Sequence, residues 1–168
     1  MKSSILLLIT LTTLLACSKN TPSTSREKDT PDFTFRAKKN GVDWKANALT
    51  ATYNEKDSMV HILVEGNHNE RFSLSFFKKP QFVGKSDEFT AGSLTPTCEH
   101  CASIAQLYKL DSAKQNSFEI MGFDNIQNRV LGRFSVYLKK DSLYAGPFTR
   151  DSSLYEGVLS TPYKTASF

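Results

Sequence analysis

Residues 71–77 read RFSLSFF, and this stretch decides the fold class that we expect. Large apolar residues alternate in it with serines: Phe72, Leu74 and Phe76 against Ser73 and Ser75. Successive side chains of a strand point to opposite faces, so an alternation with a period of two is typical of a β-strand buried on one side. The stretch therefore predicts a strand with one apolar face.

Similar segments recur along the chain. They are rich in β-branched and aromatic residues, and polar turn clusters such as NEKD, GNHNE and DNIQN separate them. We find no segment with apolar residues at helical spacing, so the sequence predicts an all-β domain, an antiparallel β-sandwich or a barrel-like meander of about eight or nine strands. Besides a first hairpin at 33–46, the expected strands are 48–53, 58–66, 71–77, 103–110, 117–124, 129–138 and 155–163.

Two intervening stretches differ from these strand segments. Asn40-Gly41 stands between short apolar-alternating runs, and this dipeptide tolerates positive φ angles, which favours a two-residue hairpin turn. The run from Pro80 to Thr97 has no clear periodicity. We expect a long loop there, with room for a short helix.

The N-terminus predicts export and a lipid anchor. Met1-Lys2 is followed by an apolar run, Ile5–Leu15, which is shorter than the roughly 20 residues that a membrane-spanning helix needs. The run ends in Leu14-Leu15-Ala16-Cys17, which resembles a bacterial lipobox. The resemblance implies that residues 1–16 are a lipoprotein signal peptide, and that Cys17 becomes the lipidated N-terminal residue carrying diacylglyceryl and palmitate-type chains. Two or three such chains hold a protein stably on a membrane.

Residues 17–31 are expected to form a flexible tether, because the sequence SKNTPSTSREKDTP after Cys17 has no large apolar side chain to bury. Ser18 follows Cys17 where aspartate would favour the inner membrane in enteric bacteria, so the expected location is the outer membrane, in a leaflet left open. Residues 32–168 then form one β-rich domain.

The charge pattern argues against nucleic acid as a partner. The net charge is +4, and removal of the signal peptide with Lys2 leaves +3. The charges are interspersed, and short runs such as Lys38-Lys39 are typical of solvated strand ends. We expect the membrane and a protein or glycan ligand as partners, with no nucleic acid and no cofactor.

Two short elements carry a resemblance to a family. FTFRAKKNGVDWKAN and, far downstream, FEIMGFDNIQNRVLGRFSVYL resemble small, functionally uncharacterised β-rich lipoproteins of Bacteroidetes-type bacteria, with NGxxWxA and fDxxxxrvxGxF elements. The resemblance implies a β-rich envelope lipoprotein and assigns no catalytic residue. The matching residues are Asn40, Gly41, Trp44 and Ala46, then Phe123, Asp124, Arg129, Val130, Gly132 and Phe134. Independently of it, Asp124 fits a turn and Gly132 fits a bulge or a close approach of another chain segment.

The stretch TPTCEHCASIA contains the only two cysteines besides Cys17. In an oxidising compartment, Cys98 and Cys101 are expected to form a disulfide that closes the loop before 103–110. Three alternatives stay open: free thiols, a thioredoxin-like redox pair, or a metal site made by Cys98, His100 and Cys101 with His61 or His68 as a fourth ligand.

No arrangement typical of catalysis stands out. His61 lies in an alternating strand and favours a core or cross-strand role, and no phosphate-binding loop or nucleophile motif appears. We therefore expect a lipid-anchored, non-enzymatic envelope module that binds a protein or a glycan. The alternative is a redox or metal-binding envelope protein centred on Cys98, His100 and Cys101. Strand tyrosines fit either ordinary packing or a sugar-binding face: Tyr108, Tyr137, Tyr144, Tyr155 and Tyr163.

Overall fold

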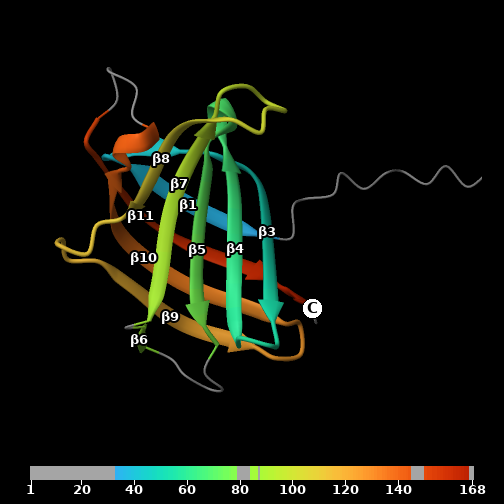
Figure 1. The fold of residues 1–168 in the computed structure, drawn as a ribbon. Coiled ribbons are helices and arrows are strands. Elements are labelled where there is room, and N and C mark those ends of the chain that lie inside the picture. Colours follow the sequence, from blue (N-terminus) through green and yellow to red (C-terminus); the bar gives the residue numbers. More distant parts are fainter. Residues whose placement is uncertain (1–32, 79–83, 87, 145–149, 167–168) are drawn as a thin grey trace, which may run out of the picture.

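A computed structural model describes residues 33–78, 84–86, 88–144 and 150–166 (Figure 1). The predicted signal peptide and the whole of the predicted tether, residues 17–31 with Cys17, lie outside the described residues. None of the helices in the described part is long and apolar enough to cross a membrane.

The described chain is built from strands, with two single 3-10 turns. The strands are β1 (Thr34–Lys39), β2 (Val42–Trp44), β3 (Ala46–Asn54), β4 (Met59–Gly66), β5 (Arg71–Phe77), β6 (Gly84–Ser86), β7 (Phe89–Pro96), β8 (Ile104–Leu110), β9 (Ser117–Asp124), β10 (Arg129–Lys140), β11 (Ser152–Pro162) and β12 (Lys164–Ala166). The 3-10 turns are η1 (Asn67–Asn69), before β5, and η2 (Ser142–Tyr144), after β10.

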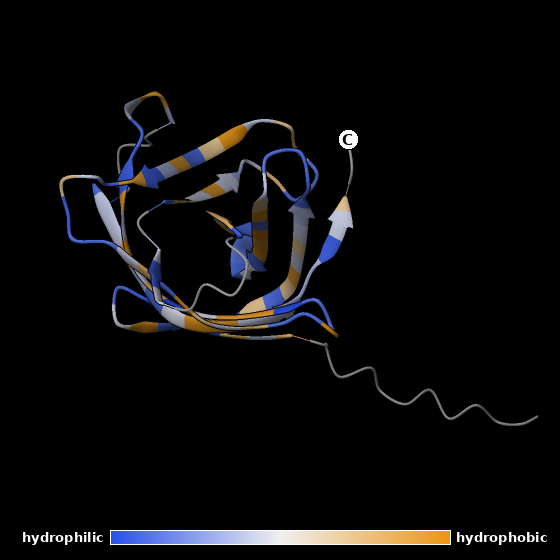
Figure 2. Cartoon of the chain, turned by 90° about the horizontal axis from the view of Figure 1, so that it is seen from below, coloured by the Kyte–Doolittle hydropathy of each residue, from blue (hydrophilic) through white to orange (hydrophobic). Residues whose placement is uncertain are grey.

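All the strands belong to one open, mixed sheet. Its order is β12-β3-β4-β5-β7-β8-β10-β11-β1-β2, and β9 pairs with β10 and with β6. Seen along the strands, the sheet curls round its own apolar face (Figure 2). The all-β prediction is confirmed. The sheet has twelve strands where about eight or nine were expected. Its pairings are antiparallel as expected except that β12 runs parallel to β3, which makes the sheet mixed.

The prediction of a long loop over Pro80–Thr97 was also wrong for most of this range, since β6 and β7 lie there. The alternation of apolar and polar residues does not predict β7, because one of its inward residues is polar. Its buried residues are Ala91, Ser93 and Pro96, and of these only Ala91 belongs to the apolar core cluster, while Ser93 is polar. The Ser93 hydroxyl donates to the buried Glu70 carboxylate, so a polar side chain satisfies a core position there.

The two turns predicted from sequence are present. Asn40 and Gly41 both have positive φ angles, 53° and 81°, between β1 and β2. The Asn40 side chain also accepts a hydrogen bond from the backbone N–H of Leu154 at 2.9 Å. Between β9 and β10, the Asp124 carboxylate accepts hydrogen bonds from the backbone N–H groups of Ile126 and Gln127. Local side-chain chemistry therefore sets the ends of both hairpins.

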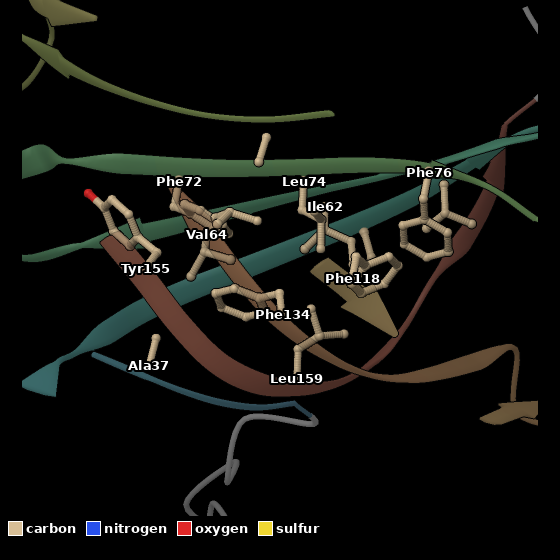
Figure 3. Close-up of a cluster of buried hydrophobic side chains, with 14 of the residues drawn as sticks. Ala37, Ile62, Val64, Phe72, Leu74, Phe76, Phe118, Phe134, Tyr155 and Leu159 are labelled. Carbon is tan, nitrogen blue, oxygen red and sulfur yellow. The ribbon is translucent and has the colours of Figure 1, made fainter. Parts of the chain in front are cut away.

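The core is a set of aromatic and aliphatic side chains on the inner face of the curled sheet. Phe72 of β5 stacks on Phe134 of β10 and on Tyr155 of β11, with ring centroids 5.3 and 5.0 Å apart. Side chains of β4 and β5 point toward those of β9, β10 and β11 across the interior (Figure 3). Because large rings dominate core energetics, this cluster holds the two sides of the curl together.

Two glycines make room for core rings. A Cβ on Gly66 would lie 2.2 Å from the Trp44 ring, and a Cβ on Gly132 would lie 2.8 Å from the Phe118 ring. The pairing of β9 with β10 also shifts register at Leu131/Gly132. Gly132 therefore combines the bulge and the close approach that its position within a strand suggested, although the approaching group is a side chain.

Candidate functional site

The outer face of the sheet carries a groove of about 880 Å³ over β2, β1, β11, β10, β9 and β6. Its floor is the backbone of Ala37, Gly157 and Phe134, which are cross-strand partners on β1, β11 and β10. Ala37 and Phe134 turn their side chains into the core. Their neighbours along each strand therefore point outward and form two rows that border the floor.

The strand register places the residues of each row next to one another on neighbouring strands. The basic row is Arg36, Val158, Arg133, Glu119 and Lys85, from β1 to β6. The acidic row is Asp43, Lys38, Glu156, Ser135 and Ser117, from β2 to β9. At the usual spacings, the rows lie roughly 7 Å apart along the strands, and the five strands from β1 to β6 span roughly 19 Å. The groove is thus long enough for an extended ligand.

Several charges in the groove have no ion-pair partner within the described residues. This holds for Arg36 and Lys38 on β1 and for Lys85 on β6. Arg133 is partly engaged, because its guanidinium lies 2.6 Å from the Glu119 carboxylate. Unpaired cations in an exposed groove are available to a ligand. Arg36 and Lys85 give the basic row an excess of positive charge, whereas Lys38 lies in the acidic row.

One tyrosine extends the groove beyond the acidic row. Tyr137, two residues after Ser135 on β10, lines the groove together with Gln115 and is half-buried. Of the other tyrosines considered from the sequence, Tyr108, Tyr155 and Tyr163 are buried and Tyr144 lies outside the groove on η2. Of these five tyrosines, Tyr137 is the one that lines the groove and fits a sugar-binding face. The three buried tyrosines are packed in the interior.

A buried polar cluster lies on the inner side of the same strands. Glu70, between η1 and β5, is only 8% exposed. Its Oε1 accepts hydrogen bonds from Lys39 Nζ at 2.6 Å, Ser93 Oγ at 2.9 Å and the Tyr155 hydroxyl. Its Oε2 accepts one from Trp44 Nε1 at 2.8 Å. The carboxylate therefore binds β1, β2, β7 and β11 together, including three of the strands that carry the groove.

The titration properties of the cluster follow from these contacts. Burial alone raises the pKa of Glu70, but hydrogen bonds from Lys39, Tyr155 and Trp44 and the charge of Lys39 outweigh it, so the pKa lies below its ordinary value. Burial and the negative charge of Glu70 raise the pKa of the Tyr155 hydroxyl. Glu70 is thus a stable carboxylate, which suits a structural role better than proton transfer near neutral pH.

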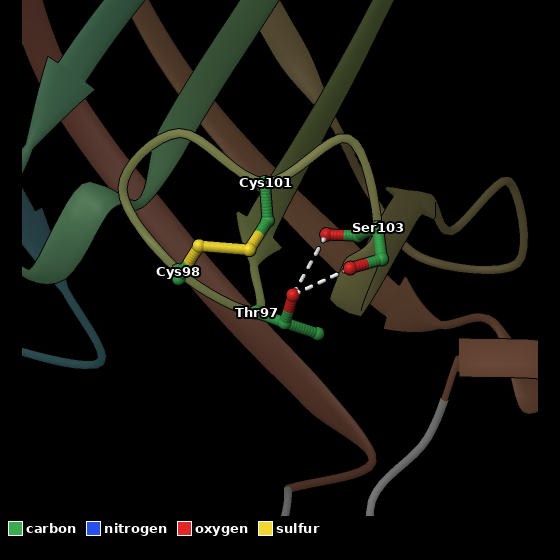
Figure 4. Close-up of a disulfide and its surroundings, with 4 residues drawn as sticks. All are labelled: Thr97, Cys98, Cys101 and Ser103. Atoms are coloured by element: carbon green, nitrogen blue, oxygen red, sulfur yellow. Dashed lines mark hydrogen bonds between the residues drawn. A yellow bond between two sulfur atoms is a disulfide. The ribbon is translucent and has the colours of Figure 1, made fainter.

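Cys98 and Cys101 form a disulfide in the loop between β7 and β8 (Figure 4). The loop is closed further by the Thr97 N–H, which donates to the Ser103 carbonyl at 3.0 Å, and by the Cys101 N–H, which donates to the Cys98 carbonyl. This is the disulfide expected from the sequence, and not one of the three alternatives to it. While the bond persists, neither sulfur is a thiolate, and metal binding at Cys98, His100 and Cys101 requires thiolates.

The histidines proposed as further ligands lie on other elements. His61 is exposed on β4, where its Nδ1 lies 2.9 Å from Ser75 Oγ on the neighbouring strand, in keeping with the cross-strand role. His68 lies in η1 with a positive φ of 58°. Among the described residues, no group of three or more His, Cys, Asp or Glu side chains is arranged to hold a metal ion.

The structure brings together residues that the sequence did not single out. Lys38 and Lys39 are an example, since adjacent lysines on a strand are typical of solvated positions. Lys38 points into the groove, whereas Lys39 points inward to the buried Glu70. Alternation along the strand signals that the two differ in direction, but the partners of each depend on which strands pair. The structural-motif residues predicted from the sequence lie in turns, in the core or at the bulge: Asn40, Gly41, Trp44, Asp124, Gly132 and Phe134.

The comparisons with known proteins supply no relative. No family model matches the chain, no curated protein matches it, and no solved structure matches it. The likeness to small β-rich lipoproteins therefore stays a prediction from the quoted elements.

Proposed function

We propose that this protein is a non-enzymatic module of the bacterial cell envelope, anchored to the outer membrane by lipid on Cys17, that binds a protein or glycan in its outer groove. The observation that carries the proposal is the groove, with Arg36, Lys38 and Lys85 unpaired within the described part of the chain. In this proposal the curled sheet is the barrel-like meander among the expected forms, with its interior filled by core side chains. Ligands then have to bind outside.

Support for the anchor comes from the lipobox-like Leu14–Cys17 stretch and the polar segment after it. The test is to express the full chain and its Cys17→Ser variant in a Gram-negative host. The wild type is expected in the outer-membrane fraction, with a mass that includes acyl chains. A Cys17→Ser chain that sediments with the membrane to the same extent would contradict the anchor.

Support for the groove comes from its geometry, and a blocking substitution tests it. Val158 lies outward between Arg36 and Arg133, so a tryptophan there would fill the groove while keeping a strand-favouring residue. The matched control is Leu63→Trp on the outer face of β4, where Leu63 is already exposed. The chain from Ser18 onward keeps every strand that the structure describes. In this form the wild type, the Val158→Trp variant and the Leu63→Trp variant would each be screened against glycan and peptide arrays.

We expect at least one ligand that binds the wild type and the Leu63→Trp variant but is lost in the Val158→Trp variant. Circular dichroism and thermal unfolding would show that both variants are folded. If every ligand of the wild type also binds the Val158→Trp variant, the groove is not the binding surface and the proposal fails.

A redox or metal-binding function at Cys98, His100 and Cys101 is the second candidate, and the exposed position of Cys98 in a disulfide loop favours it. Native mass spectrometry of the chain from Ser18 onward, purified without chelator, separates the two. A mass two hydrogens below the reduced value with no adduct fits a structural disulfide. A bound metal, or thiols that stay reduced in an oxidising compartment, would favour the second candidate.

A further inference from the structure

We propose that the ligand of the outer groove is an acidic saccharide, an oligosaccharide whose sugar rings carry carboxylates. The inference rests on the proposed function, because it assumes that the groove is the binding surface. It goes further by assigning the chemistry of the ligand. The distribution of charges, hydroxyls and one aromatic ring between the two rows supports it.

The basic row supplies the charge recognition. Arg36, Arg133 and Lys85 lie on β1, β10 and β6, and Glu119 is the one carboxylate between them. Arg36 and Arg133 are two strands apart with Val158 between them, so their guanidinium groups flank an apolar surface. Arginine matches planar carboxylates with paired N–H donors, and such charge-assisted bonds are the stronger ones. A ligand with carboxylates at intervals along its length suits this row.

The acidic row suits hydroxyl groups. Glu156 and Asp43 offer carboxylate acceptors, and Ser135 and Ser117 offer groups that both donate and accept. The Ser135 hydroxyl lies 3.4 Å from a Glu156 oxygen, a long contact that leaves both groups with capacity for another partner. A sugar ring presents several hydroxyls beside its one carboxylate, so it can meet both rows at the same time.

Tyr137 adds an aromatic surface at the end of the groove. It follows the acidic row by two residues on β10, and Gln115 lines the groove beside it. An aromatic ring binds apolar faces, while the Gln115 amide adds a donor and an acceptor. The combination of ring, amide, carboxylates and cations favours a ligand that is polar, hydroxylated and negatively charged.

An acidic peptide fits the same surface less well. Its acidic side chains carry carboxylates but no hydroxyl groups, so they would offer no donors to Glu156 and Asp43, which lie on either side of Lys38. A peptide often gains affinity by adding a strand to a free sheet edge. Within the described residues β2 and β6, at the two ends of the groove, are edge strands, but β1, β11 and β10 under its floor have partners on both sides. The floor of the groove therefore offers no unpaired backbone to a peptide.

Isothermal titration calorimetry at low ionic strength tests the inference with three probes. The chain from Ser18 onward would be titrated with a linear galacturonic acid hexasaccharide, with its fully methyl-esterified and therefore uncharged form, and with hexaglutamate. We expect the acidic hexasaccharide to bind at least about tenfold more tightly than either control. Arg36→Gln and Lys85→Gln should each weaken it about tenfold, because both cations lack a partner in the described part of the chain.

The matched control is Arg71→Gln on β5, whose guanidinium lies 3.5 Å from Glu65 and outside the groove. It should leave the affinity unchanged within about twofold. Equal binding of the methyl ester would overturn the role of charge, and equal binding of hexaglutamate would overturn the choice of a saccharide. If none of the probes binds but the array screen finds a ligand that is lost in Val158→Trp, this inference fails and the proposed function stands.

Discussion

At the scale of single residues, Glu70 is the one charged residue among the buried residues that the structure describes. It follows a polar turn in sequence, and nothing in that context marks it as buried. Four donors from four strands converge on its carboxylate, with Lys39 at 2.6 Å and Trp44 at 2.8 Å among them. A buried charge is tolerated only when it is paired and hydrogen-bonded, and Glu70 meets both conditions.

Replacing Glu70 with glutamine should lower the free energy of unfolding by about 2–4 kcal/mol. The amide keeps one acceptor but presents N–H donors to a cluster that already consists of donors, and it leaves Lys39 without its ion pair. Chemical denaturation followed by circular dichroism measures the loss. Glu65→Gln is the control, because Glu65 is exposed and its substitution should change stability by less than about 0.5 kcal/mol. Equal effects of the two substitutions would contradict the structural role of Glu70.

The lowered pKa of Glu70 also predicts a dependence of stability on pH. A carboxyl with a lower pKa in the folded state stabilises the fold fully above its unfolded pKa of about 4.3, and this contribution is lost as the pH falls through the folded pKa. The difference in unfolding free energy between the wild type and Glu70→Gln should therefore shrink below about pH 4. A difference that stays constant from neutral pH down to pH 3 would show that the charge of Glu70 contributes nothing.

Gly66 sets the position of Trp44, the only tryptophan of the chain. A Cβ at Gly66 would lie 2.2 Å from the Trp44 ring, so Gly66→Ala must displace the ring from Glu70. We expect a loss of about 1–3 kcal/mol and a red shift of tryptophan fluorescence in the folded protein. Gly122→Ala is the matched control, since a Cβ there meets nothing within 4 Å. Unchanged fluorescence in Gly66→Ala would mean that the ring does not lie over Gly66.

At the scale of strands and hairpins, the sequence was most informative where hydropathy alternates. β4, β5, β9 and β10 lie within a residue or two of the predicted positions, because their inward residues are large and apolar. β7 was missed since its inward Ser93 is satisfied by Glu70, a contact between segments far apart in the sequence. The short strands β6 and β12 have few apolar residues and are defined only by their pairing.

The groove could not be predicted from the sequence, for a related reason. Each of its charged residues looks like an ordinary solvated side chain, and the two rows exist only because of the strand register. The disulfide was accessible from the sequence, because pairing is the expected state of two cysteines three residues apart in a chain that is predicted to be exported. A bond between residues close in the sequence can thus be predicted from the sequence. A surface shared by six strands can be predicted only when the pairing of those strands is known.

The β7–β8 hairpin should be stabilised locally by its disulfide. A loop this small restricts the unfolded chain only weakly, so Cys98→Ser/Cys101→Ser should cost about 2 kcal/mol at most. Hydrogen exchange of the amides of Thr97 and Cys101 should speed up, while the exchange at β10 and β11 should follow the change in global stability alone. Complete unfolding on reduction would contradict a local role.

At the scale of the whole molecule, the two faces of the sheet have separate tasks. The inner face packs the aromatic core and the Glu70 cluster, and the outer face of β1, β11, β10 and β9 carries the groove. β1 begins at Thr34, directly after the expected tether, and it contributes Arg36 and Lys38 to the groove. Residues 17–32, fully extended, would span at most roughly 55 Å, which sets how far from the membrane a bound ligand lies under the proposed function.

Amide chemical-shift mapping would test most directly whether the outer groove is the binding surface. The ¹⁵N-labelled chain from Ser18 onward would be titrated with the galacturonic acid hexasaccharide. We predict saturable shifts at the amides of the two rows on β1, β11, β10 and β9, and their loss in Val158→Trp but not in Leu63→Trp. Shifts centred on the Cys98–Cys101 loop, or saturable shifts that persist in Val158→Trp, would contradict this assignment.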